Sequence, residues 1–263
     1  MSGGVLRQVA SEWRKVTTTK LLWILVLASI AFNGLQVALL VLVAPGTVTD
    51  STGLQPLDEP AYITYVLAVA GGASLFALIL GIIGMTGEYR HMTITSTLLA
   101  SPRRGRMLLG KGVSYALIGA VVAVANVIAV TAMTAIALSL APGPHAAIDP
   151  TEVGKVLFGV TLGLAIYAVL GMSIGALIKN QVGAIVLAVV WVLLLEPLLG
   201  LFLPDVAKWL PGSALSATMS VSTTADLSST DLLPVWGGAL LLIAYAVVLA
   251  TLASFTTVRR DIT

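Results

Sequence analysis

The chain contains no cysteine and little charge. Without cysteine there is no disulfide, no thiol nucleophile and no thiolate metal site. Charged residues are 10% of the 263 residues and hydrophobic residues are 58%, whereas a soluble domain typically carries about 25% charged residues. The two histidines, His91 and His145, lie far apart in the sequence, so a histidine metal site is not expected. This composition excludes an ordinary soluble domain and indicates an integral membrane protein.

A complete nucleotide-binding motif is also missing. Gly105 to Lys111 matches the first seven positions of a phosphate-binding P-loop, but Gly112 stands where a serine or threonine must bind Mg²⁺. No strand pattern precedes this segment, and it leads directly into an apolar stretch. The sequence also has no arrangement of serine, histidine and aspartate that suggests an activated nucleophile. We therefore expect a chain that is not an enzyme, binds no cofactor or metal, and has no nucleic-acid partner.

Six apolar segments are long enough to cross a bilayer. They cover residues 21–43, 62–85, 112–140, 153–178, 182–202 and 234–256. The first has 23 residues without a charge, which is roughly 34 Å of helix and too long for the core of a signal peptide. We predict an all-α integral membrane protein in which residues 1–263 form a single six-span domain.

Basic residues lie mostly on one side of these spans. If the spans alternate in direction, 12 of the 14 Lys and Arg share a side with both termini and residues 86–111, and only Lys155 and Lys208 lie opposite. The positive-inside rule then places both termini and 86–111 in the cytoplasm. Residues 204–233 form the longest external segment. Its first half is semi-apolar, which leaves open whether it re-enters the membrane.

Residues 5 to 20 have the pattern of a helix lying on the membrane surface. Apolar side chains recur at helical spacing and basic ones fall on other faces: Leu6, Val9, Trp13 and Val16 against Arg7, Arg14 and Lys15. This pattern fits an interfacial amphipathic helix on anionic lipid, with its tryptophan at head-group depth. The alternative is a disordered basic tail.

The segment from Met85 to Lys111 is the longest polar stretch between apolar spans in which Lys and Arg outnumber Asp and Glu. We predict that the second apolar helix stops at Gly87 and that a short amphipathic helix runs from Glu88 to about residue 101, before Pro102. Glu88 would then sit at a helix start, where a carboxylate caps free amides. The simpler alternative is a loop whose positive charges only orient the protein.

Few polar residues interrupt the predicted spans. Asn33 and Gln36 share a face of the first span, and Asn126 lies within the third. Such amides more often join helices than bind ligands. Glu196, followed by Pro197, lies in the far third of the fifth span, where a carboxylate is costly unless it is paired, protonated or facing water. We treat these five residues as pathway or packing candidates.

The fourth span carries a stripe of glycines. Its members are Gly159, Gly163, Gly171 and Gly175. Small residues spaced in this way allow another helix to approach closely. That neighbour can belong to the same chain or to a second one, so the stripe predicts helix packing without deciding between the two.

Three motifs in order suggest a family. Gly87 to Lys111 has the sequence GEYRHMTITSTLLASPRRGRMLLGK, residues 12–15 are E-W-R-K, and residues 208–215 are KWLPGSAL. Together they resemble the ABC-2-type permeases, the membrane subunits of ABC exporters, and small actinobacterial permeases in particular. That family commonly carries E-[YF]-R-x-G-T after its second span, then Pro-Arg, then a lysine that opens the third. Met92 stands where glycine is common.

The resemblance implies a permease subunit of the bacterial cytoplasmic membrane. It would work as a dimer with a second copy or a paralogue, among membrane lipids. Separate ATP-binding cassette subunits would hold ATP and Mg²⁺, and the exported substrates would be drugs, lipids, peptides or other amphiphiles. The cytoplasmic coupling helix, docked on the ATPase, would involve Glu88, Tyr89, Arg90, Thr93, Thr97, Pro102, Arg103 and Arg104. Two alternatives stay open: a non-transporting scaffold or immunity subunit, and an ion-coupled secondary carrier.

Overall fold

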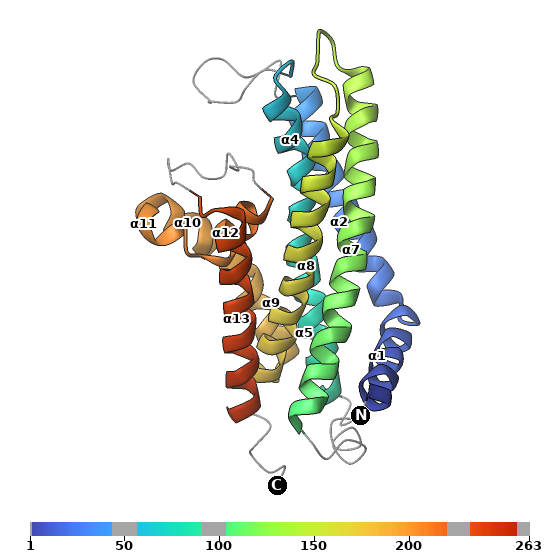
Figure 1. The fold of residues 1–263 in the computed structure, drawn as a ribbon, viewed down its shortest axis with the longest axis vertical. Helices are drawn as coiled ribbons and strands as arrows, with labels where there is room; N and C mark the ends of the chain where they lie inside the picture. The colour runs from blue at the N-terminus through green and yellow to red at the C-terminus, as the bar shows by residue number, and fades with distance from the viewer. Residues whose placement is uncertain (1, 44–56, 91–103, 220–231, 257–263) are drawn as a thin grey trace.

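The computed structural model describes residues 2–43, 57–90, 104–219 and 232–256 (Figure 1). These residues form helices and short connections, and no strand occurs among them. Six helical runs are long and apolar enough to cross a membrane: Lys20–Val43, Pro60–Arg90, Leu108–Leu140, Pro150–Ile178, Gln181–Phe202 and Val235–Phe255. The prediction of an all-α, multi-pass membrane protein is therefore confirmed.

Three spans are continuous helices, and three change helix type. The continuous ones are α7 (Arg104–Leu140), α8 (Pro150–Ile178) and α13 (Val235–Thr256). The first span is α2 (Lys20–Ala38) with the π-helix η1 (Leu39–Val43); the second is α4 (Pro60–Ala68), the 3₁₀ turn η2 (Val69–Ala73) and α5 (Ser74–Arg90). The fifth is α9 (Gln181–Val190), the π-helix η3 (Trp191–Leu195) and α10 (Glu196–Phe202). Outside the spans lie α1 (Ser2–Thr17), α11 (Pro204–Ala207) and α12 (Pro211–Thr218).

Local sequence explains several of these boundaries. Asp149 starts α8 by accepting a hydrogen bond from the backbone N–H of Thr151 at 2.8 Å, with Pro150 in the first helical position. The helix ends at Ile178, and the next residue, Lys179, has a left-handed φ of 57°. The Asn180 side chain then starts α9 by accepting from the N–H of Gly183 at 3.0 Å. Two adjacent spans are thereby joined through a very short turn, as the sequence predicts.

The second and fourth spans form the centre of the bundle. In their most apolar stretches 72% of the second span and 61% of α8 are buried, against 6% of the fifth span. Large apolar side chains such as Trp23, Leu194 and Leu240 are exposed on the outer helices. In a membrane these side chains would face lipid, so the inner helices carry the specific packing.

The glycine stripe of α8 packs against helices of the same chain. Gly171 and Gly175 lie against α5, while Gly159 and Gly163 lie against α12. The closest approach is at Gly171, where an added Cβ would be 1.9 Å from the carbonyl oxygen of Leu78. The space beside each of these four glycines is already occupied by α5 or α12, so the stripe gives no argument for a dimer.

The second span is longer than the sequence predicts. We expected the helix to stop at Gly87 and a new one to begin at Glu88, but α5 continues through both residues to Arg90. The only described glycine with a positive φ is Gly143, so Gly87 keeps an ordinary helical backbone. Likewise α7 begins at Arg104, ahead of the predicted start of the third span. Residues 91–103, the rest of the predicted coupling helix, lie outside the described residues.

The chain segments rich in basic residues come to one end of the bundle. Figure 1 shows α1, the end of α5, the start of α7 and the C-terminal end of α13 together there. The short helices α10, α11 and α12 lie toward the other end of α13, where α10 contacts α11 and α12 packs against α13. This arrangement agrees with the alternation of spans on which the predicted orientation rests.

Candidate functional site

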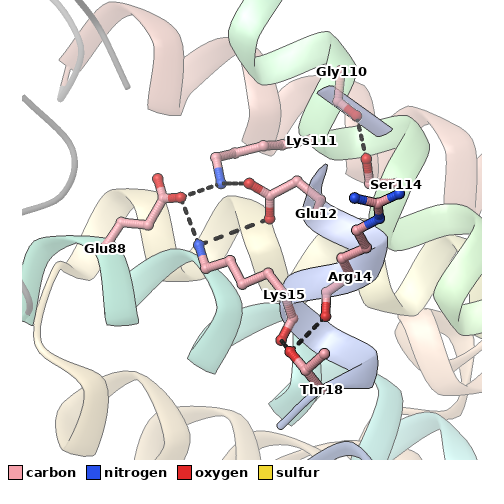
Figure 2. Close-up of polar contacts among 8 residues, drawn as sticks. All are labelled: Glu12, Arg14, Lys15, Thr18, Glu88, Gly110, Lys111 and Ser114. Carbon is pink, nitrogen blue, oxygen red and sulfur yellow. Dashed lines mark hydrogen bonds and ion pairs between the residues drawn. The ribbon is translucent and has the colours of Figure 1, made fainter. Parts of the chain in front are cut away.

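Four charged residues from three helices meet at the basic end of the bundle (Figure 2). Glu12 and Lys15 come from α1, Glu88 from α5 and Lys111 from α7. The Nζ of Lys111 lies 2.6 Å from Oε1 of Glu88 and 2.8 Å from Oε1 of Glu12. The Nζ of Lys15 lies 2.8 Å from the same Oε1 of Glu88 and 3.9 Å from Oε2 of Glu12. We call these four residues the ion-pair network.

The network is buried everywhere except at Lys15. The side chain of Lys111 is 0% exposed, that of Glu88 is 3% and that of Glu12 is 8%, while Lys15 is 47% exposed. Removing a charge from water costs several kcal/mol unless a partner compensates it. Two carboxylates and two ammonium groups sum to zero here. The loss of any one of them would therefore leave an uncompensated charge in a buried place.

The sequence places these side chains by simple helical geometry. Glu12 and Lys15 are three residues apart, so they share one face of α1. Lys111 precedes Tyr115 by one helical turn, and both point inward from α7, where each is 0% exposed. Tyr115 fits because residue 84 is glycine: a Cβ there would lie 1.6 Å from the tyrosine hydroxyl oxygen. The network thus stands beside a close contact between α5 and α7.

The network joins α1 to both helices that flank residues 91–103. Its shortest contacts are charge-assisted hydrogen bonds, the strongest ordinary kind in proteins. A displacement of the end of α5 or of the start of α7 must therefore move α1 as well, or break a buried ion pair. The network ties the positions of these three helices together, and its lysines and glutamates are held by each other.

The structure places the residues predicted for coupling in different environments. Glu88 belongs to the network, but as part of the continuous α5, so the expectation that it caps a helix start is wrong. Tyr89 is half-buried, and the Nζ of Lys179 lies 5.7 Å from the centre of its ring, a cation–π contact that links α5 to the turn after α8. Arg90 is exposed, and Arg104 is the first residue of α7. Thr93, Thr97, Pro102 and Arg103 lie outside the described residues.

Sequence reasoning missed the roles of Glu12, Lys15 and Lys111 in this network. A signal was present in the charge pattern. Glu12 is the single carboxylate of residues 1–20, and Glu88 is the single carboxylate of residues 85–111. A lone acidic residue in each of two basic segments can pair with a lysine of the other segment, and such pairing allows the charges to be buried.

A second polar cluster lies between α2 and α7. Nδ2 of Asn33 donates to Oδ1 of Asn126 at 3.0 Å. Nδ2 of Asn126 donates to Oγ of Ser29 at 3.0 Å and to the carbonyl oxygen of Val122 at 2.9 Å. The three polar side chains are fully buried. Asn33 and Asn126 therefore act in helix packing, the commoner use of such amides inside membranes.

The other three pathway candidates line a cavity. Gln36, Glu196 and Pro197 border a space of about 320 Å³ between the first two spans and the α10–α12 region. Oε1 of Glu196 accepts a hydrogen bond from the backbone N–H of Gly212, in the first turn of α12, at 2.7 Å. A carboxylate is favoured at a helix start. Glu196 is thereby stabilised at the edge of a cavity. Asn33 and Gln36 share one face of α2, as the sequence predicts, because the side chains of both lie against Gly72.

No model of a known protein family and no curated protein matches the sequence of this chain. In the part of the chain that the structure describes, no three His, Asp or Glu side chains come together as metal ligands. Its distinctive features are a buried junction of three helices at one end and a cavity bordered by a carboxylate toward the other.

Proposed function

We propose that this chain is the permease subunit of an ATP-driven exporter of the ABC-2 type, lying in a bacterial cytoplasmic membrane with both termini in the cytoplasm. The observation that supports this best is the ion-pair network. It joins α1 to the two helices that flank residues 91–103, and those residues form the middle of the Gly87–Lys111 motif that resembles the coupling element of the family.

In this proposal residues 91–103 contact a separate ATP-binding cassette subunit. A push on this segment moves α5 and α7 because the chain is continuous with both. The network passes the same displacement to α1. From α5 the motion reaches α8, since Gly171 lies against the backbone at Leu78 with no room for a side chain between them. A short segment can thus move the centre of the bundle.

The proposed assembly contains two permeases, identical or paralogous, and two ATPase subunits. The substrate is an amphiphile such as a drug, lipid or peptide. The cavity bordered by Gln36 and Glu196 lies away from the proposed ATPase side and supports a route for such a molecule toward the outer face. ATP and Mg²⁺ belong to the ATPase, because the chain has no complete P-loop.

The test begins with the reading frames beside the gene of this chain, where we expect an ATP-binding cassette protein, and reconstitutes the two proteins together. Both proteins are purified together and placed in proteoliposomes, and ATP hydrolysis and the movement of a fluorescent amphiphile are measured. We expect hydrolysis to rise when the permease is present and transport to require ATP. A scaffold or immunity subunit would leave both at background. Transport that follows a proton or sodium gradient without ATP would show an ion-coupled carrier, and either outcome would overturn the proposal.

A further inference from the structure

A cavity of about 290 Å³ lies beside the ion-pair network, bordered by the end of α1, the start of α2, α5 and α7. Its polar lining is Lys15, Thr19 and Tyr115. Its apolar lining includes Leu21, Leu80 and Ile83. The volume is at the lower end of the range of small-molecule sites. One part of the wall can therefore meet a charged group while the other part meets hydrocarbon.

Tyr115 brings a buried donor to this cavity. Its side chain is 0% exposed, and its hydroxyl has no hydrogen-bond partner among the described residues. Buried hydroxyls usually find a partner because an unpaired one costs free energy. Gly84, which also lines the cavity, leaves the space that the hydroxyl occupies. A ligand oxygen in the cavity would supply the missing acceptor.

Lys15 brings positive charge to the opening. Its ammonium group has three donors, and only its contact with Glu88, at 2.8 Å, is within hydrogen-bond distance. Nearly half of the side chain is exposed. Arg14 and Lys20 are also exposed nearby in the chain, and no acidic residue occurs from Trp13 to Thr49. The network is neutral by itself, so this surplus of positive charge is available to an anion.

The lining is mostly apolar, with a few polar groups, and this selects the kind of anion. A free ion such as phosphate would leave the apolar wall facing water. A phospholipid satisfies both parts, with its phosphate near the basic residues and its chains along the apolar helices. Basic pockets at the cytoplasmic side of membrane proteins bind acidic lipids, and the proposed orientation puts this end there. Trp23, 59% exposed near the start of α2, suits the head-group region.

We propose that this cavity binds the head group of an acidic phospholipid from the cytoplasmic leaflet. Lys15 lies toward the phosphate, and the hydroxyl of Tyr115 donates to a phosphate or ester oxygen. The Thr19 hydroxyl already donates to the carbonyl oxygen of Val16 at 2.7 Å, so Thr19 borders the site without donating to the lipid. Because Lys15 also belongs to the ion-pair network, the bound lipid holds α1 in place against α5 and α7. This binding needs no ATPase partner, and it can be tested whether or not the proposed export activity holds.

The experiment fills the cavity without touching the network. Gly87 lines the cavity, and a Cβ added to it meets no atom within 4 Å, so Gly87→Leu places its side chain in open space. Gly154→Leu is the matched control: it is also a helical glycine with open space around it, near the start of α8 at the other end of the bundle. Native mass spectrometry of the purified chain measures binding of phosphatidylglycerol and phosphatidylcholine, with inorganic phosphate as a competitor.

We expect the wild type and Gly154→Leu to bind one phosphatidylglycerol about tenfold more tightly than phosphatidylcholine, and Gly87→Leu to lose that preference. Tyr115→Phe should weaken phosphatidylglycerol binding roughly two- to tenfold, the value of one hydrogen bond. Inorganic phosphate should not displace the lipid. Equal binding of both lipids by the wild type, displacement by phosphate, or a Tyr115→Phe variant that binds normally and melts at a higher temperature would each overturn the inference.

Discussion

Replacing Lys111 with methionine tests how strongly the ion-pair network holds this end of the bundle. Methionine keeps much of the length of lysine and removes the charge. Lys111 is 0% exposed and contacts carboxylates at 2.6 and 2.8 Å, so its loss leaves two buried carboxylates with only Lys15 to compensate them. Removing one partner of a buried ion pair typically costs about 3–5 kcal/mol. We expect Lys111→Met to lower the free energy of unfolding by about that amount.

The chain offers a control with the same ion-pair distance and different burial. Lys155 contacts Glu152 at 2.6 Å, but its side chain is 56% exposed. Solvent screens such a pair, and exposed ion pairs contribute little. Lys155→Met should therefore leave stability unchanged. Unfolding in mixed micelles with increasing SDS, followed by tryptophan fluorescence, measures both variants against the wild type.

A double-mutant cycle separates ion pairing from loss of packing. Glu88→Gln and Lys111→Met should each destabilise the protein, because each leaves the network with one uncompensated charge. The double variant removes both charges, so its loss should be smaller than the sum of the two single losses. Strictly additive losses, or a Lys111→Met variant as stable as Lys155→Met, would show that the network does not hold the three helices together.

Three further predictions test other parts of the account. Gly171→Leu should destabilise the chain by about 1–3 kcal/mol or more, because even a Cβ would be 1.9 Å from the carbonyl oxygen of Leu78; a wild-type unfolding curve would contradict the packing of α8 on α5. Glu196→Ala should cost about 1 kcal/mol and speed proteolysis near α12, because Gly212 loses its acceptor; unchanged cleavage would argue against this cap. Single cysteines can be placed freely in this cysteine-free chain. With an impermeant reagent in intact cells, one at Ser222 should react and one at Ser101 should not, and the reverse result would invert the topology.

The spans were predictable from sequence because length and apolarity are local properties. Each of the six apolar segments corresponds to a helical run in the structure. The prediction that failed also rested on local sequence. Gly87 followed by the charged Glu88 predicted that the second span ends there. Tertiary ion pairing overrides that preference, because Glu88 meets Lys15 and Lys111 and needs no exit to water.

The network itself was out of reach of periodicity arguments. Lys111 contacts Glu12 across 99 positions of sequence and Glu88 across 23. Helical spacing says which residues share a face, and it does not say which other helix that face meets. Asn33 and Gln36 illustrate the same limit, since one joins α7 and the other borders a cavity. The lone carboxylates in two basic segments were the available signal.

The most direct test of the central claim is the number of substrate molecules moved per ATP hydrolysed. The claim is that the ion-pair network couples residues 91–103 to α1, α5 and α7. Glu88→Gln and the control Glu152→Gln, from the exposed pair with Lys155, would be reconstituted with the ATPase partner, with assembly checked by mass. We expect a wild-type ratio for Glu152→Gln and a lowered ratio for Glu88→Gln, with ATP hydrolysis continuing. If Glu88→Gln assembled normally and kept the wild-type ratio, the network would be a structural contact only.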